Sequence, residues 1–221
     1  MTAGSTTIKR NRTISYQAVF FDFDGVIVES TEIKTQAFRK LYTEHVVVLD
    51  DIVAYHVAHE GISRLEKILY CHKKFLGIEL GEDELAELAG SYSALVKQAV
   101  INCDSVPGAL DFLQAHSADL PMFVVSGTPE GELKDIVEAR GLSSYFTSVH
   151  GSPHHKAPIV NEQLQLHGLD RDQCLFVGDA MTDHDAARDT GLTFIGRVGQ
   201  GHVNLFPKGT TIITDLAQLT V

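Results

Sequence analysis

Short apolar runs that alternate with helical patterns constrain the fold of this chain more than any other feature. The first run, at 17–23, contains β-branched and aromatic residues and ends in acid, which favours a buried strand. Strands that alternate with helices are typical of a parallel sheet covered on both faces, because parallel strands need helical crossovers. We therefore expect an α/β fold with strands at 17–23, 122–127, 148–152, 173–179, 192–197 and 210–214.

The middle of the chain breaks this alternation. A helical pattern runs from Ser30 to about His45, and residues 50–100 continue as helix after helix without a convincing strand. We interpret this stretch as an all-helical insertion after the first strand. The predicted domains are an α/β core from 1–32 and 103–221 and a helical domain from 33–102. Further helices are expected around 110–113, at 130–140 and 157–167, and around 186–190.

Composition and charge exclude several classes of protein. The chain has 221 residues, 44% hydrophobic and 21% charged, as expected for a globular protein. Its net charge of −11 repels polyanions, so nucleic acid is not an expected partner. No apolar run reaches the roughly 20 residues that a membrane helix needs. Residues 1–15 lack the apolar segment of a signal peptide and are expected to be a frayed tail.

The cysteines indicate a compartment. There are three, far apart and without metal-site spacing, which favours reduced thiols in a cytosolic protein. We therefore expect a cytoplasmic protein that does not bind a membrane. The sequence leaves open whether it is a monomer or a homodimer.

Polar residues stand at the ends of several predicted strands. Ligands of open α/β sheets bind outside the carboxyl ends of the strands. If these strands are neighbours in the sheet, their polar residues converge on one site. The residues are Asp22 and Asp24 after the first strand, Ser126 and Gly127 after the second, Lys156 at a loop-to-helix junction, and Asp179 and Asp183 after the strand at 173–179.

This set of residues suits phosphoryl transfer. Clustered carboxylates provide the hard oxygen ligands that Mg²⁺ prefers, and a carboxylate can attack phosphorus to form an aspartyl-phosphate. Carboxylates also repel a phosphate dianion, so the site needs cations, which Mg²⁺ and Lys156 supply. Ser126 and the Gly127 N–H can hold phosphate oxygens. Asp24, two residues after Asp22, can serve as acid and then base.

At this point the chain resembles a known family. The segments FFDFDGVIVES (20–30), VVSGT (124–128) and VGDAMTD (177–183), together with Lys156, resemble the four ordered motifs of the haloacid dehalogenase-like (HAD) hydrolase superfamily. The resemblance covers essentially the whole chain, since the helical insertion is similar to that family's cap. It implies a Rossmann-like, doubly wound parallel sheet with an inserted all-helical cap domain. It points to the helical-cap phosphatase and β-phosphoglucomutase-like branch.

The resemblance also implies roles for individual residues. It implies Mg²⁺ as cofactor and a small phosphorylated metabolite as substrate. Asp22 matches the nucleophile and Asp24 the general acid/base. Ser126 and Gly127 match the phosphate-binding segment, and Lys156 matches the cation that neutralises nucleophile and phosphate. The metal-binding residues are matched by Asp22, Asp24 (through its carbonyl), Asp179 and Asp183.

Specificity is expected to come from the cap. Arg64 lies at a plausible loop-to-helix entry that faces the catalytic residues, where it could hold a substrate carboxylate or a second phosphate. The alternative is an arginine on a solvated helix face. Lys34 and Arg39 are weaker candidates. We expect the cap to move on hinges near 30–35 and 100–106.

Four functions remain to be compared. The first is a phosphatase for a small metabolite. The second is a phosphomutase, whose relatives tend to carry histidine twelve residues after the nucleophile, where this chain has Lys34. The third is a dehalogenase, a branch that lacks the second aspartate, so Asp24 argues against it. The fourth is a catalytically silent binding protein, which the filled catalytic positions disfavour.

Overall fold

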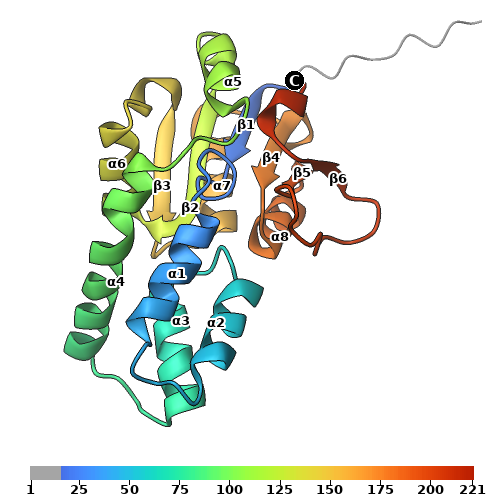
Figure 1. The fold of residues 1–221 in the computed structure, drawn as a ribbon. Coiled ribbons are helices and arrows are strands. Elements are labelled where there is room, and N and C mark those ends of the chain that lie inside the picture. The colour runs from blue at the N-terminus through green and yellow to red at the C-terminus, as the bar shows by residue number, and fades with distance from the viewer. Residues whose placement is uncertain (1–15) are drawn as a thin grey trace, which may run out of the picture.

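The core of the protein is one parallel sheet. The computed structural model describes residues 16–221, so the tail predicted at 1–15 lies outside the described residues. The sheet has six strands in the order β3-β2-β1-β4-β5-β6 (Figure 1). Every predicted strand is confirmed to within a few residues. The strands are β1 Ala18–Phe21, β2 Met122–Pro129, β3 Ser148–Ser152, β4 Cys174–Gly178, β5 Thr193–Arg197 and β6 Thr211–Ile213.

The strand order places β1 at a topological switch point. Phe21, at the end of β1, pairs in parallel register with Val124 of β2 on one side and Val177 of β4 on the other. The carboxyl ends of these strands therefore lie side by side. In open α/β sheets this is where ligands bind, so the sheet itself brings the segments after β1, β2 and β4 together.

Helices cover both faces of the sheet, which confirms the doubly wound arrangement. Side chains of β1 alternate between the faces. Val19 and Phe21 pack into one apolar cluster with α5 and α6, and Phe20 packs into a second with α7 and α8. Burial on both faces explains why the strands are continuous apolar runs. The helices are α5 Ala109–His116, α6 Glu130–Ala139, α7 Lys156–His167 and α8 Met181–Thr190, with short 3₁₀ turns at Ser143–Tyr145, Arg171–Gln173 and Leu216–Gln218.

All the named elements between β1 and α5 are helices. Figure 1 shows α1, α2 and α3 grouped beyond the carboxyl edge of the sheet, with α4 running from that group along α6. The predicted boundary of 33–102 for a cap domain stays a prediction. None of the helices within 16–221 combines the length and apolar character needed to cross a membrane. The helices are α1 Thr31–Leu41, α2 Leu49–Ala58, α3 Arg64–Cys71, a π-helical turn His72–Leu76, and α4 Glu82–Asn102.

The prediction for the first helix was too long. It was expected to reach about His45, but α1 ends at Leu41 and turns connect it to α2. The following run of Val46, Val47 and Val48 is β-branched, which lowers helix propensity. Val46 and Val47 are exposed, so no apolar burial offsets that cost.

The two connections between sheet and helical group run beside each other. The Glu29 N–H donates to the Asp104 carbonyl at 2.9 Å, and Val28 forms an antiparallel bridge with Ser105. Arg140, just after α6, donates to three backbone carbonyls at the end of α4, at 2.7 to 2.8 Å. The segments near 30–35 and 100–106, where hinges are predicted, therefore begin beside each other, and Arg140 of the core binds the second of them. Motion about them stays a prediction.

Candidate active site

Three carboxylates, two buried and one half-buried, meet at the switch point. Asp22 follows β1, Asp179 follows β4, and Asp183 lies in the first turn of α8. One ligand oxygen from each lies within 4.8 Å of the others. Lys156, the first residue of α7, places its Nζ 2.7 Å from Asp22 Oδ2 and 2.5 Å from Asp183 Oδ1. The structure thus gathers residues from three separate segments around one ammonium group.

Local geometry explains why Asp24 is followed by glycine. Gly25 has a φ of +70°, a region that favours glycine, and a Cβ there would lie 1.9 Å from Asp179 Oδ2. The Asp24–Gly25 turn therefore lets the loop after β1 approach the loop after β4. Asp183 is fixed by the Ala180 N–H, which donates to its Oδ2 at 3.0 Å at the start of α8.

The electrostatics of this group favour a bound cation. Burial raises the pKa of both Asp179 and Asp183, and the charge of Asp22 raises them further. Burial alone would lower the pKa of Lys156, but the adjacent Asp183 and Asp22 raise it, so Lys156 stays charged. One lysine does not balance three carboxylates. Clustered carboxylate oxygens are the donors that Mg²⁺ prefers, so these residues fit a divalent cation.

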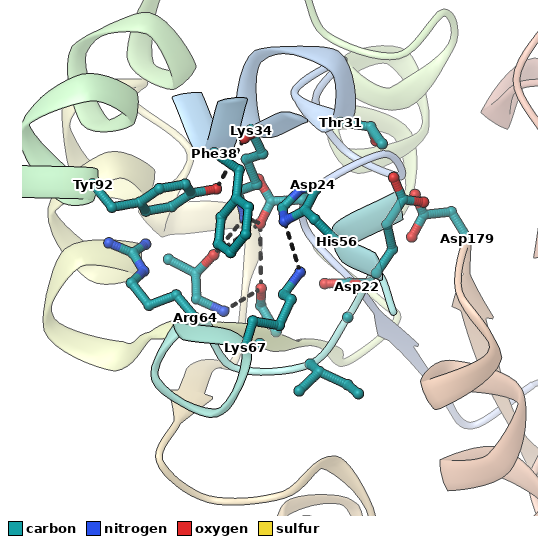
Figure 2. Close-up of a pocket in the computed structure, with 16 residues that line it drawn as sticks. Asp22, Asp24, Thr31, Lys34, Phe38, His56, Arg64, Lys67, Tyr92 and Asp179 are labelled. Carbon is teal, nitrogen blue, oxygen red and sulfur yellow. Dashed lines mark hydrogen bonds and ion pairs between the residues drawn. The ribbon is translucent and has the colours of Figure 1, made fainter. Parts of the chain in front are cut away.

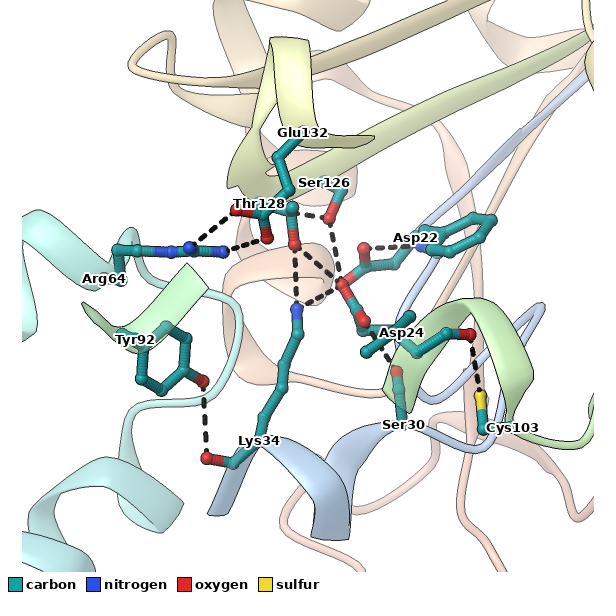
Figure 3. Close-up of polar contacts among 12 residues, drawn as sticks. Asp22, Asp24, Ser30, Lys34, Arg64, Tyr92, Cys103, Ser126, Thr128 and Glu132 are labelled. Atoms are coloured by element: carbon teal, nitrogen blue, oxygen red, sulfur yellow. Dashed lines mark hydrogen bonds and ion pairs between the residues drawn. The ribbon is translucent and has the colours of Figure 1, made fainter. Parts of the chain in front are cut away.

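Asp24 has its own set of partners, distinct from those of Asp22. Lys34 from α1 forms an ion pair with Asp24 Oδ2. Thr128 Oγ1 donates to the same oxygen at 2.9 Å, and Ser30 Oγ donates to Oδ1 at 2.6 Å. Burial would raise the pKa of Asp24, but Lys34 and these hydroxyl groups lower it overall. Figure 3 shows the Lys34 ammonium between Thr128 and Asp24.

Residues 126–128, in the second half of β2, supply polar groups beside Asp24. Ser126 is buried, donates to Asp24 Oδ2 at 3.4 Å, and accepts from the Thr128 N–H at 3.2 Å. Gly127 faces the loop before α3, where a Cβ would lie 2.5 Å from the Gly61 carbonyl oxygen. The helical group therefore closes directly over this segment.

A cavity of about 60 Å³ lies between the sheet edge and the helical group (Figure 2). Both parts of the chain contribute to its wall, so a ligand at Asp22 would also contact α1, α3 and α4. The lining residues are Asp22, Asp24, Thr31, Lys34, Phe38, His56, Glu60, Gly61, Ile62, Arg64, Lys67, Tyr92, Ser126, Gly127, Thr128 and Asp179.

Arg64 lines the cavity but is already paired. Its guanidinium donates to both carboxylate oxygens of Glu132 in α6, at 2.9 and 2.5 Å, and also to Ser93. It lies over the Tyr92 ring at 4.8 Å. The side chain is only 6% exposed, so the alternative of a solvated helix face is wrong. Its role in specificity stays a prediction. Arg39, a weaker candidate, instead pairs with Asp50 on the surface.

Sequence reasoning gave little weight to three residues that the structure brings to the site. Thr128 ends the VVSGT segment, and its hydroxyl at the end of a strand was the available signal. Lys34 was only a weak candidate because its pairing with Asp24 depends on how α1 is placed. Lys67 lies in the helical region, and its place beside the site depends on how α3 is docked. It lines the cavity at the second turn of α3.

Comparison with known proteins agrees with this geometry. A family model described as haloacid dehalogenase-like hydrolase matches residues 19–197. A phosphoglycolate phosphatase of Rhodospirillum rubrum is 27% identical over 194 residues, which span 81% of this chain and 78% of the relative.

Two solved structures share the fold. A crystal structure described as a predicted phosphoglycolate phosphatase from Haemophilus somnus has a TM-score of 0.70 at 22% identity, covering 91% of this chain and 95% of that one. A β-phosphoglucomutase from Clostridium difficile has a TM-score of 0.71 at 20% identity, covering 93% of each chain. At such identities the likeness extends to the fold alone.

Proposed function

The chain belongs to the haloacid dehalogenase-like hydrolases and is a phosphatase, and we propose that it hydrolyses a small phosphorylated metabolite through an aspartyl-phosphate on Asp22. The observation that carries this proposal is the Lys156 ammonium, which bridges Asp22 and Asp183 at the carboxyl edge of the sheet. A carboxylate held beside a fixed cation can approach a phosphate dianion that would otherwise repel it.

The proposed cofactor is Mg²⁺. Asp22, Asp179 and Asp183 would hold the ion, and their clustered oxygens suit a hard divalent cation. When bound, the ion supplies positive charge that offsets the repulsion between these carboxylates and the phosphate.

The chain's own residues can carry both halves of the reaction. An Asp22 oxygen attacks phosphorus and the ester P–O bond breaks. The leaving oxygen takes a proton from Asp24, which must bind that proton when the substrate enters, because its contacts in this structure lower its pKa. Water then attacks phosphorus, Asp24 takes its proton, and the bond from phosphorus to Asp22 breaks to release inorganic phosphate. Ser126 and the Gly127 N–H would hold the phosphate oxygens, and Lys156 would keep Asp22 oriented throughout.

A mutase is the alternative, and two contacts favour the phosphatase over it. A mutase must hold a second phosphate of a bisphosphate, which calls for free cations on the cavity wall. Glu132 already pairs with Arg64 through both carboxylate oxygens. Lys34 is engaged with Asp24 and Thr128. Neither side chain is free for a second phosphate unless it first loses its partner, so among the described lysines and arginines of this wall only Lys67 is left for it.

Release of inorganic phosphate tests the proposal. The full chain with Mg²⁺ should hydrolyse p-nitrophenyl phosphate or acetyl phosphate, and chelation of the metal should stop the reaction. Asp22→Asn should lower the rate at least about 1000-fold, because it removes the nucleophile. Asp119→Asn, an exposed carboxylate outside the site, is the matched control and should keep full activity. Full activity of Asp22→Asn, or no phosphate release from either compound by the parent, would contradict the proposal.

A further inference from the structure

Within the described part of the chain, the cavity wall formed by the helical group contains one lysine or arginine without a carboxylate partner. Arg64 is saturated by Glu132 and Ser93, and Lys34 is paired with Asp24. Lys67 is 6% exposed and lines the same cavity. Among the pairs within residues 16–221, its Nζ has no carboxylate oxygen within 4.0 Å. The positive charge of Lys67 is therefore buried and not balanced by a direct ion pair.

The hydrogen-bond donors of Lys67 are also largely free. An ammonium carries three N–H groups, and within the described residues Lys67 has one hydrogen-bond partner, His56 Nδ1, at 3.4 Å. Burial, followed by the charge of Lys67, lowers the pKa of His56 to about 2. This histidine is therefore neutral and accepts a hydrogen bond from the Lys67 ammonium. Figure 2 shows the Lys67 ammonium directed at His56 within the cavity. The remaining N–H groups are available to a ligand.

A buried ammonium with free donors is costly unless something pairs with it. Glu60, which also lines the cavity, makes no ion pair with it in the described chain. One positive charge without a direct carboxylate contact matches a monoanion. A second phosphate, with a charge near −2, would leave negative charge unbalanced because Arg64 and Lys34 are engaged.

We propose that Lys67 determines specificity by binding a carboxylate on the leaving group, so that the substrate is a phosphomonoester of a hydroxy acid. This inference rests on the proposed phosphatase activity and names the substrate class of that same site. The carboxylate accepts from Lys67, while the phosphate lies at Asp22. His56 holds the ammonium in place from the other side.

A pair of esters of similar shape, one with a carboxylate and one with a neutral amide, tests this inference. The probes are 2-phosphoglycolate and its uncharged amide, with acetyl phosphate as a reference that carries no carboxylate. With Mg²⁺, the parent should have a kcat/KM about 10- to 100-fold higher for the carboxylate than for the amide, the range expected for a buried charged hydrogen bond. Lys67→Met should lose this preference because it hydrolyses 2-phosphoglycolate more slowly, while its hydrolysis of the amide changes little.

The control is Lys74→Met, which removes an exposed lysine from the same helical region and should keep the preference. Equal rates for the two esters in the parent would overturn the inference without any variant, so it remains testable if Lys67→Met does not fold. A preference that persists in Lys67→Met would also overturn it. Hydrolysis of acetyl phosphate separates the role of Lys67 from the proposed function. If acetyl phosphate is hydrolysed but the carboxylate preference is absent, only the role of Lys67 is rejected. If the parent releases no phosphate from any of the three compounds, the proposed function is rejected.

Discussion

Replacing Glu132 with glutamine keeps the shape of the side chain but leaves the Arg64 guanidinium without its counter-charge. The two side chains are 6% and 9% exposed, and they join α3 of the helical group to α6 of the core through two hydrogen bonds. Breaking one partner of such a buried pair costs about 3–5 kcal/mol. Glu132→Gln should therefore lower the free energy of unfolding by that amount, as measured by urea denaturation at neutral pH.

A double-mutant cycle isolates the pair from other effects of each substitution. Arg64→Met combined with Glu132→Gln removes both charges, so its loss should be well below the sum of the single losses, with a coupling of at least about 2 kcal/mol. The matched control is Lys97 with Asp135, which joins α4 to the same helix α6 but is 41% and 59% exposed. Its coupling should be about 0–1 kcal/mol. A coupling for the buried pair no larger than that of the exposed pair would refute the reasoning.

Three further predictions concern closure, pH and the hinge. Gly127→Ala should lower kcat/KM for acetyl phosphate at least about tenfold, because its Cβ would lie 2.5 Å from the Gly61 carbonyl oxygen. In the control Gly131→Ala the Cβ meets nothing within 4 Å, so this variant should be active. Equal activities of the two variants would contradict the role of this contact. Burial lowers the pKa of Lys67 to about 8, and its charge is present below that pKa and lost above it. The ratio of kcat/KM for 2-phosphoglycolate to that for its amide should therefore fall as pH rises from 7 to 10, and a flat ratio would count against Lys67. Arg140→Ala should cost about 2–3 kcal/mol in urea denaturation, because it removes charged donors from the carbonyls at the end of α4; a loss below about 0.5 kcal/mol would show that these bonds contribute little.

The strands and the acidic residues at their ends could be predicted because both depend on local sequence. A buried parallel strand is a short apolar run, and Asp22 and Asp179 follow such runs directly. Asp24–Gly25 could be recognised as a turn from its two residues alone. The assembly of these residues into one site depends on the strand order, which places β1 between β2 and β4. The alternation of strands and helices predicts a parallel sheet but does not specify that order.

The contacts between the helical group and the core could not be predicted in the same way. Arg64 and Glu132 are 68 positions apart, and their pairing depends on how α3 docks against α6. A helical pattern identifies an apolar face but does not say which polar residues a second domain will cover, so Arg64 could be interpreted as solvated. The place of Lys34 beside Asp24 likewise depends on the direction in which α1 leaves the sheet.

The most direct test of the account is to trap the phosphoryl group on the nucleophile. Asp24→Asn should slow the attack of water on the aspartyl-phosphate, because the general base is lost. After incubation with acetyl phosphate and Mg²⁺ and rapid acid quench, mass spectrometry should find one added phosphoryl group on the peptide that contains Asp22, with the modification on that residue. Phosphate release with the label on another residue, or undiminished hydrolysis by Asp22→Asn, would contradict the central claim.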